Sequence, residues 1–382
     1  MRARQSVQSV ILAFLLSFVG ACQVVDETDR SPYVYRQPQE RGDGWQTSAT
    51  SAQGIDPSPL ADMINGVRDN VFRNIHSVLV VRNEKLVLEE YFPGFDLLGP
   101  YTEFDWNVRH LLCSSTKSFA SALLGIAYDQ GLLGEVSTPL RVFYPEHADI
   151  DWSGARGRIT LEHALTMSAG LEWDEGTYSY LDPRNHSAIM WTSADPIRYL
   201  LSRPMAAEPG SVFVYNGGLS ITIADIAGKV SGLAADQFAL RYLFMPLGIQ
   251  DFVWEKHADG TVQAAGGLYL RPRDMAKFGQ LYLNGGTWKG IRVISSEWVA
   301  ESTKKRIWAG DRTRHYGFQW WIEEHLWQGT VVTSFAARGW GGQRIYVFPD
   351  LELVVVFTGG NHYTLANPEH AMLAQYILPA VH

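Results

Sequence analysis

Length, composition and charge place this chain among globular proteins of substantial size. It has 382 residues, of which 46% are hydrophobic and 19% charged, enough to bury a large core in one domain or in two closely packed ones. The formal net charge is -8 and no long run of Lys or Arg occurs, so the composition gives no support to a nucleic-acid partner.

The N-terminus has the layout of an export signal, which we predict over residues 1–21. Two arginines precede an apolar stretch at 10–19, and small residues lead to Cys22. The sequence VGAC resembles the lipobox of bacterial lipoproteins, which implies cleavage before Cys22 and a membrane anchor on its acylated thiol. The alternative is an ordinary signal peptide with an incidental cysteine. Because Gln23 follows instead of Asp, we expect the periplasm-facing outer membrane.

The next segment, residues 22–56, is polar and lacks sustained periodicity, so we predict a tether between membrane and domain. The folded domain is then predicted over 57–382. It begins with a helical pattern after Pro57 and continues with two alternating apolar runs at 77–81 and 86–91, the pattern of a β-hairpin.

Helical periodicity dominates the middle of the chain. Residues 114–130 form an apolar helix that Gly131 caps, and helical segments continue to about residue 250. Strand-like runs return near the end, and a final helix is expected at 369–376; the runs lie at 316–322, 330–335, 343–348 and 353–358. The pattern predicts an α+β fold, an antiparallel sheet built from both chain ends, flanked by helices, with a mostly helical subdomain inserted at about 120–250.

A Ser-x-x-Lys motif opens the apolar helix at Ser114. Lys117 lies one helical turn away, on the same face, where it can reach the Ser114 hydroxyl. The start of a helix also provides free backbone N–H groups that stabilise developing negative charge. The motif alone is weak, because a second copy begins at Ser302, but that copy lies in the charged run ESTKKR.

The order and spacing of several segments over about residues 60–378 resemble the β-lactamase-related serine hydrolases, the family of class C β-lactamases, penicillin-binding proteins, 6-aminohexanoate-dimer hydrolases and related esterases. The segments are LLCSSTKSFASALLGIAYDQGLL, ITLEHALTMSAGLEW, EPGSVFVYNGG, GGLYLRPRDMAKFGQLYL and ARGWGGQRIYVFPDLELVVV. The resemblance implies the β-lactamase/DD-peptidase-like fold, with Ser114 as nucleophile and Lys117 as its partner.

The family's second motif, Tyr-x-Asn or a variant, corresponds to Tyr215, Asn216 and Gly217, so Gly217 replaces the usual Asn. The resemblance implies that Tyr215 passes the Ser114 proton to the leaving group; whether Lys117 or Tyr215 is the principal base stays open.

The third family motif is Lys-Thr-Gly or His-Thr-Gly, and its best match is Ala337-Arg338-Gly339. The missing cation at its first position disfavours a dedicated β-lactamase. Trp340 would supply a backbone N–H that joins that of Ser114 in an oxyanion hole.

Further substrate contacts are expected from Tyr178, Tyr180 and Arg338, because the two tyrosines resemble in position the site-covering aromatic residue of 6-aminohexanoate-dimer hydrolases. We therefore expect an envelope serine hydrolase that cleaves a small ester or amide, with no cofactor or metal. Two alternatives stay open: a D,D-peptidase or β-lactamase acting on peptide-like substrates, and a non-catalytic ligand-binding protein of the envelope.

Overall fold

The computed structural model describes residues 31–97, 99–311, 314–364 and 366–382. Residues Val34–His382 form one folded unit. The predicted signal peptide and the predicted lipid anchor at Cys22 lie outside the described residues.

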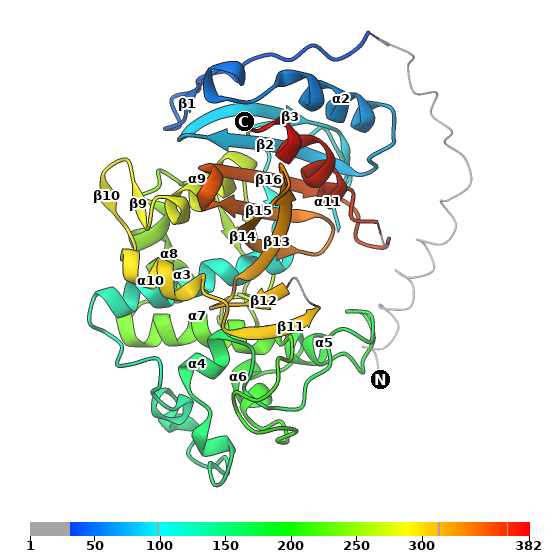
Figure 1. Ribbon diagram of the computed structural model, residues 1–382. Coiled ribbons are helices and arrows are strands. Elements are labelled where there is room, and N and C mark those ends of the chain that lie inside the picture. Colours follow the sequence, from blue (N-terminus) through cyan, green and yellow to red (C-terminus); the bar gives the residue numbers. More distant parts are fainter. Residues whose placement is uncertain (1–30, 98, 312–313, 365) are drawn as a thin grey trace. The chain divides into compact units, whose positions relative to one another are not determined.

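A nine-stranded sheet within the described residues forms the frame of the domain, in the order β1-β3-β2-β16-β15-β14-β13-β12-β11 (Figure 1). Neighbouring strands are antiparallel except for β1 and β3, which run parallel. The strands are β1 (Gln46–Thr47), β2 (Ile75–Arg82), β3 (Lys85–Tyr91), β11 (Ile307–Asp311), β12 (Arg314–Tyr316), β13 (Trp321–Trp327), β14 (Thr330–Gly339), β15 (Gln343–Phe348) and β16 (Leu353–Gly359). The predicted sheet from both chain ends is confirmed.

The predicted hairpin is β2 and β3. Both residues of its turn, Asn83 and Glu84, have positive φ (48° and 62°), as a two-residue turn between twisted strands requires.

Three small sheets accompany the large one: β4 (Gly94–Phe95) with β5 (Tyr101–Thr102), β9 (Thr287–Trp288) with β10 (Ile291–Arg292), and β6 (His110–Leu111) with β8 (Leu268–Leu270) and β7 (Val253–Trp254).

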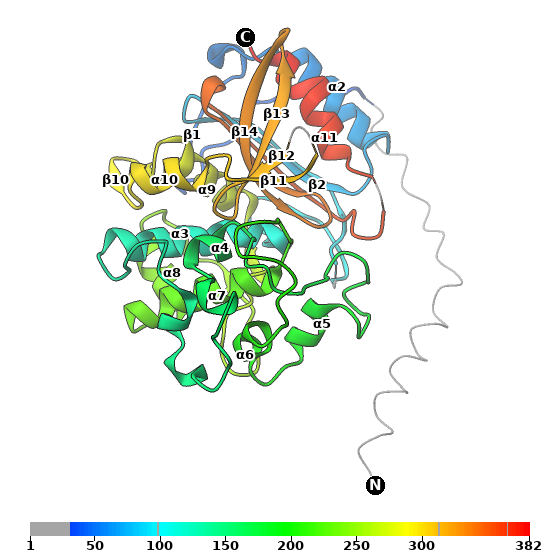
Figure 2. The ribbon, with the colours of Figure 1, turned by 60° about the horizontal axis from the view of Figure 1, so that its bottom comes forward.

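Helices cover both faces of the large sheet (Figures 1 and 2). The N-terminal helix α2 (Pro57–Arg68) lies with the C-terminal helices α11 (Pro368–Met372) and α12 (Leu378–Ala380) on one side. On the other side, α9 (Pro272–Leu283) packs on β2, β15 and β16, and its Phe278 stacks on Phe119 with ring centroids 3.7 Å apart. This stack joins the sheet to the helical region.

Between β6 and β7 the regular elements are helical, as predicted for the inserted subdomain. Besides short 3-10 helices, they are α3 (Thr116–Asp129), α4 (Leu161–Leu165), α5 (His186–Trp191), α6 (Pro196–Leu201), α7 (Gly217–Ser231), α8 (Ala235–Ala239) and a π-helical turn (Leu240–Phe244). Among the described residues no single helix is long and apolar enough to cross a membrane; only α7 and α8 with the π-turn, bent by 77°, pass such a test together. Most of the side chains on α7 are buried within the domain.

The predicted tether at 22–56 is wrong for its C-terminal part. Trp45 is 4% exposed, its ring lies edge-on to Trp288 at 5.2 Å, and its Nε1 donates to the carbonyl of Arg273 (3.1 Å). Strand β1 follows at once, and Ile55 forms a β-bridge with Val381. A few buried side chains therefore attach this polar segment to the domain.

The predicted strand at 316–322 is interrupted. A Cβ on Gly317 would lie 2.3 Å from the Ser302 carbonyl oxygen, and Gln319 has a φ of 64°. The Gln319 amide donates to the carbonyls of Ala164 and Leu165. The chain thus leaves the sheet after β12 and returns at β13 (α10, Ser296–Ser302, lies beside this turn).

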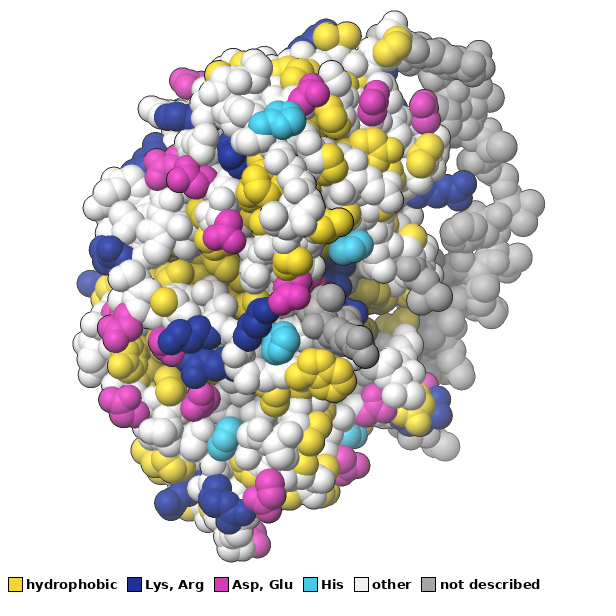
Figure 3. Space-filling view, in the orientation of Figure 1, with side chains coloured by type: hydrophobic (Ala, Val, Ile, Leu, Met, Phe, Trp, Pro, Cys, Tyr) yellow, Lys and Arg dark blue, Asp and Glu magenta, His cyan; other side chains and the backbone are white. Residues whose placement is uncertain are grey.

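On the face of the described residues shown in Figure 3, basic and acidic side chains lie close to one another. Exposed ion pairs also occur among the described residues, such as Arg198 with Asp149 and Arg158 with Glu208, and pairs of this kind contribute little to stability. The mixture of basic and acidic side chains leaves the face in Figure 3 without a field of one sign that would attract a polyanion.

Candidate active site

Ser114 lies where the chain turns from β6 into α3. A short 3-10 turn, Cys113–Ser115, precedes the helix, and the buried Cys113 has a φ of 46°, a strained value for a residue with a side chain. Burial raises the pKa of the Cys113 thiol well above its ordinary range, so this thiol stays protonated. The strained turn places Ser114 at the start of the helix, as the sequence predicted, and leaves it partly exposed.

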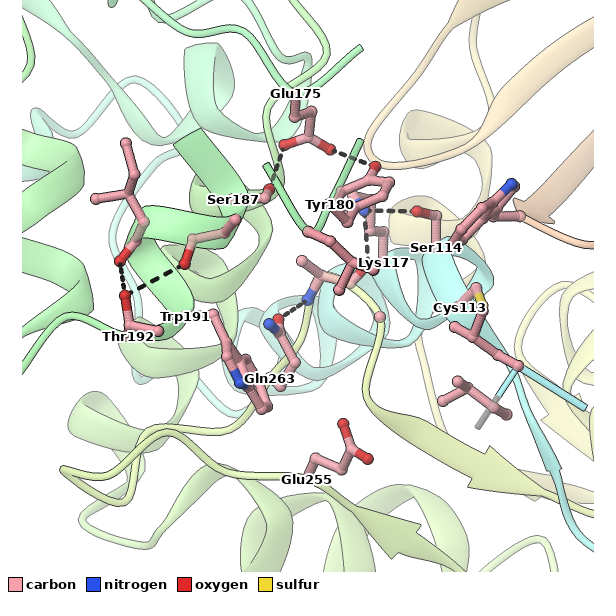
Figure 4. A pocket seen from close by; sticks show the side chains of 18 of the residues that line it. Cys113, Ser114, Lys117, Glu175, Tyr180, Ser187, Trp191, Thr192, Glu255 and Gln263 are labelled. Carbon is pink, nitrogen blue, oxygen red and sulfur yellow. Dashed lines mark hydrogen bonds between the residues drawn. The ribbon is translucent and has the colours of Figure 1, made fainter. Parts of the chain in front are cut away.

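Lys117 stands one turn further along α3 and is 2% exposed. Its Nζ donates to Ser114 Oγ (2.9 Å) and to the carbonyl of Ala265 (2.6 Å), and Figure 4 shows both bonds. The second bond fixes the amine from the segment that precedes β8. Ser114 and Lys117 are therefore brought together as the motif predicted.

Tyr215 lies directly before α7, and the side chain of Asn216 caps that helix by accepting from Leu219 N (3.3 Å). The Tyr215 ring stacks on Trp321 with centroids 5.9 Å apart. Lys117 Nζ lies 4.8 Å from the centroid of the same ring. Lys117 thus meets Tyr215 through the ring face, which holds the tyrosine beside the Ser114–Lys117 pair.

The second Ser-x-x-Lys copy is not a site. Ser302 is fully buried at the end of α10, where its hydroxyl donates to the Val299 carbonyl (3.1 Å). Lys305, its partner by spacing, forms a surface ion pair with Glu324. The structure therefore distinguishes the Ser-x-x-Lys motif at Ser114 from the one at Ser302, whereas the motif pattern alone is the same at both positions.

The end of β14 lies against the turn that carries Ser114. A Cβ on Gly339 would lie 2.2 Å from the Leu112 carbonyl oxygen and 3.1 Å from Ser115 N, so only glycine fits here. Ala337 is buried in the core, whereas Arg338 lies over the Trp321 ring and pairs with Glu323. The positive charge on this strand is therefore at position 338, and not at position 337, where the third family motif has its cation.

The family model described as Beta-lactamase matches residues 69–375. The chain belongs to the β-lactamase family. It is 25% identical over 299 residues to 6-aminohexanoate-dimer hydrolase of Paenarthrobacter ureafaciens, covering 73% of this chain and 70% of that one. As a β-lactamase-family member with relatives of this kind, it is a serine hydrolase.

Solved structures share the fold of this β-lactamase-family chain. A penicillin-binding protein from Bacillus halodurans superposes with a TM-score of 0.64 at 16% identity, over 82% of this chain and 100% of that one. A family VIII carboxylesterase superposes with a TM-score of 0.65, also at 16% identity, over 84% and 96%. The predicted family and fold class are confirmed.

Two pockets meet at Ser114 in this β-lactamase-family fold. The first, about 690 Å³, has a mainly apolar wall, and the second, about 530 Å³, is lined by aromatic and charged side chains. The apolar wall includes Leu97, Leu111, Leu181, Ile189 and Trp191. The second pocket includes Tyr178, Tyr215, Trp321, Arg338 and Arg344. Tyr180 and Trp340 border both pockets, with ring centroids 5.7 Å apart.

Glu175, which is not among the residues predicted from the sequence, also borders both pockets. It lies on the same loop as Tyr178 and Tyr180, and its carboxylate is buried beside Tyr180 and Ser187 (Figure 4). The glycine at position 217, where the family motif has Asn, is the sequence feature that indicates such a residue. The space left by the missing side chain must be filled by another group, which is Glu175.

Buried histidines lie behind Trp340. His76 Nδ1 is 2.9 Å from His110 Nε2, and Asp96 lies 3.7 Å from His110 and 3.5 Å from His362. The His362 ring contacts Trp340 edge-on at 5.2 Å. Burial, with the neighbouring His110, lowers the pKa of His76 from 6.5 to about 3. Within the described residues no group of three or more His, Cys, Asp or Glu is arranged to hold a metal ion.

Proposed function

We propose that this β-lactamase-family serine hydrolase cleaves a small ester or amide through an acyl-enzyme on Ser114. The observation that carries the proposal is the 2.9 Å contact between Lys117 Nζ and Ser114 Oγ at the junction of two pockets. A buried amine held against a serine hydroxyl is the arrangement that activates such a nucleophile.

The reaction proceeds in two steps. Ser114 Oγ attacks the carbonyl carbon and its proton passes to Lys117 or Tyr215, while the backbone N–H groups of Ser114 and Trp340 stabilise the oxyanion. The bond to the leaving group then breaks, and the relayed proton goes to the departing oxygen or nitrogen. Water attacks the acyl-enzyme by the same relay, releasing the acid and restoring Ser114.

Each of the two pockets binds one part of the substrate. Tyr215, which would protonate the leaving group, borders the second pocket, so we assign the leaving group to that side and the acyl group to the apolar pocket. Tyr178, Tyr180 and Arg338 are then substrate contacts. The relative from Paenarthrobacter ureafaciens is named for the dimer of 6-aminohexanoate, a linear amide, so linear amides belong beside esters in a substrate screen.

The D,D-peptidase or β-lactamase alternative receives less support. Ala337 is buried in the core, and Arg338, the cation that follows it, is paired with Glu323. Both features reduce the positive charge that would bind the carboxylate of a peptide or β-lactam.

The test is labelling of the full-length protein with a fluorophosphonate, followed by intact mass. Wild type and Ser302→Ala should gain one adduct, and Ser114→Ala should gain none and lose ester or amide hydrolysis by about 10³-fold or more. An unlabelled wild type would support the non-catalytic binding protein instead. Export to the outer membrane through acylated Cys22 stays a prediction, since that residue lies outside the described part of the chain.

A further inference from the structure

Glu175 is a buried carboxylate that the proposed reaction does not use. It is 5% exposed, and donors surround it: Gly217 N at 2.6 Å, Trp173 Nε1 at 2.7 Å, Ser187 Oγ at 2.9 Å and the Tyr180 hydroxyl at 3.5 Å. A carboxylate removed from water is costly unless such donors compensate it, so this set of contacts requires a specific fit.

The carboxylate occupies the space that a side chain at position 217 would enter. A Cβ built on Gly217 would lie 3.1 Å from Glu175 Oε2, 3.0 Å from Ala265 Cβ and 3.4 Å from Ser187 Oγ. These contacts are tighter than ordinary van der Waals distances on two sides. A side chain at 217 would therefore fit only if Glu175 or Ala265 moved by a few tenths of an ångström.

This position touches both halves of the proton relay. Gly217 is the first residue of α7 and follows Tyr215 by two residues, so the Glu175–Gly217 bond fixes the segment that carries Tyr215. Negative charge is also favourable at a helix N-terminus. Ala265, whose Cβ bounds the same space, accepts the hydrogen bond that orients Lys117 (2.6 Å).

We propose that Glu175 is a positioning residue that supplies, from a different loop, the polar group that a side chain at 217 would otherwise provide. It holds Tyr215 and Lys117 in register with Ser114 and holds the Tyr180 hydroxyl at the border of the two pockets. The proposal rests on the proposed function, because it assigns Glu175 a role in the same relay.

A double variant distinguishes a positioning role of Glu175 from a purely structural role. It removes the Glu175 side chain and introduces a side chain at Gly217. Glu175→Ala should lower kcat by about 10²-fold, the usual effect of misplacing catalytic groups by about 1 Å. Gly217→Asn alone should also lower kcat, because the introduced side chain meets Glu175. In the double variant, the introduced asparagine side chain enters the vacated space, and this variant should recover at least about 10-fold of the kcat lost in Glu175→Ala.

The experiment measures kcat and KM for p-nitrophenyl butyrate, the rate of fluorophosphonate labelling at Ser114, and Tm, for wild type, both single variants and the double variant. Glu175→Gln, which keeps the size and one acceptor oxygen, should stay folded with a smaller loss of kcat and keeps the test valid if Glu175→Ala does not fold. Glu172→Ala, on the same loop and with a half-exposed side chain, is the matched control and should match wild type.

The outcomes are distinguishable. If the wild type is labelled but the kcat of the double variant is no higher than that of Glu175→Ala, the positioning role alone is overturned. The same holds if Glu175→Ala has a lower Tm but the kcat of wild type. Absence of labelling in wild type would overturn the proposed function and this inference with it. Recovery in the double variant with unchanged KM would establish the exchange.

Discussion

At the scale of single residues, the ring and the hydroxyl of Tyr215 have separable roles. The ring packs between Lys117 and Trp321, and these contacts do not involve the hydroxyl. We expect Tyr215→Phe to keep the packing and the Tm while kcat falls by about 10²- to 10⁴-fold, the usual contribution of a positioned proton donor.

Steady-state kinetics with an ester and with an amide would check this, and Tyr101→Phe, whose side chain is exposed, is the control. The loss should be larger for the amide, because its leaving nitrogen needs the proton more than a phenolate does. Wild-type rates in Tyr215→Phe with both substrates would assign the whole relay to Lys117.

The contact between Ser114 and Lys117 could be predicted from the sequence because it is local. Ser114 and Lys117 are three residues apart on one helix, so helical geometry alone brings them together. Glu175 lies 42 residues from Gly217, and its hydrogen bond to that residue exists only in the folded chain. Residue types and spacing cannot encode such a contact, although the missing side chain at 217 marks where it forms.

At the scale of elements, periodic patterns predicted the long strands and helices, and short or irregular ones were missed. Strand β2 is buried from Ile75 to Val81, and α3 repeats its apolar residues along its length. Strand β1 has two residues and carries no period, and the turn at 317–320 is fixed by distant partners such as Ser302. Those features come from tertiary contacts, which override local propensity.

The attachment of β1 predicts that Trp45 is part of the core and not of a tether. Trp45→Ala removes the contact with Trp288 and leaves a cavity, so the free energy of unfolding should fall by about 3–5 kcal/mol. Val34→Ala, at a position that is 72% exposed in the same segment, should change it little. Urea unfolding of both variants measures the difference. If Trp45→Ala and Val34→Ala had equal free energies of unfolding, the prediction of a tether over the whole of residues 22–56 would stand.

At the scale of the whole molecule, segments from both chain ends meet behind the active site. His76 comes from β2, His110 from β6 and His362 from the chain after β16, and Asp96 lies between the last two. The strand pairing of β2 with β16 brings the segments of His76 and His362 together. The histidines therefore report on the assembly of the sheet, since their buried environment is lost when the chain unfolds.

This arrangement predicts a pH-dependent stability with a definite sign. Burial lowers the pKa of both His76, to about 3, and His110, so as the pH falls below about 6.5 the unfolded chain binds protons that the folded chain does not. The stabilisation is complete above about pH 6.5 and is lost progressively towards pH 3. Each such histidine contributes a slope of up to about 1.4 kcal/mol per pH unit to the free energy of unfolding.

Urea unfolding between pH 7 and pH 5, where carboxylates titrate least, would measure that slope. His76→Gln should be less stable than wild type at pH 7, because His110 loses its partner, but its free energy of unfolding should change less steeply with pH. His382→Gln, at the exposed C-terminus, should keep the wild-type slope. A slope unchanged in His76→Gln would mean that this histidine is protonated to the same extent in the folded and unfolded chain, and that its buried contact with His110 does not exclude the proton.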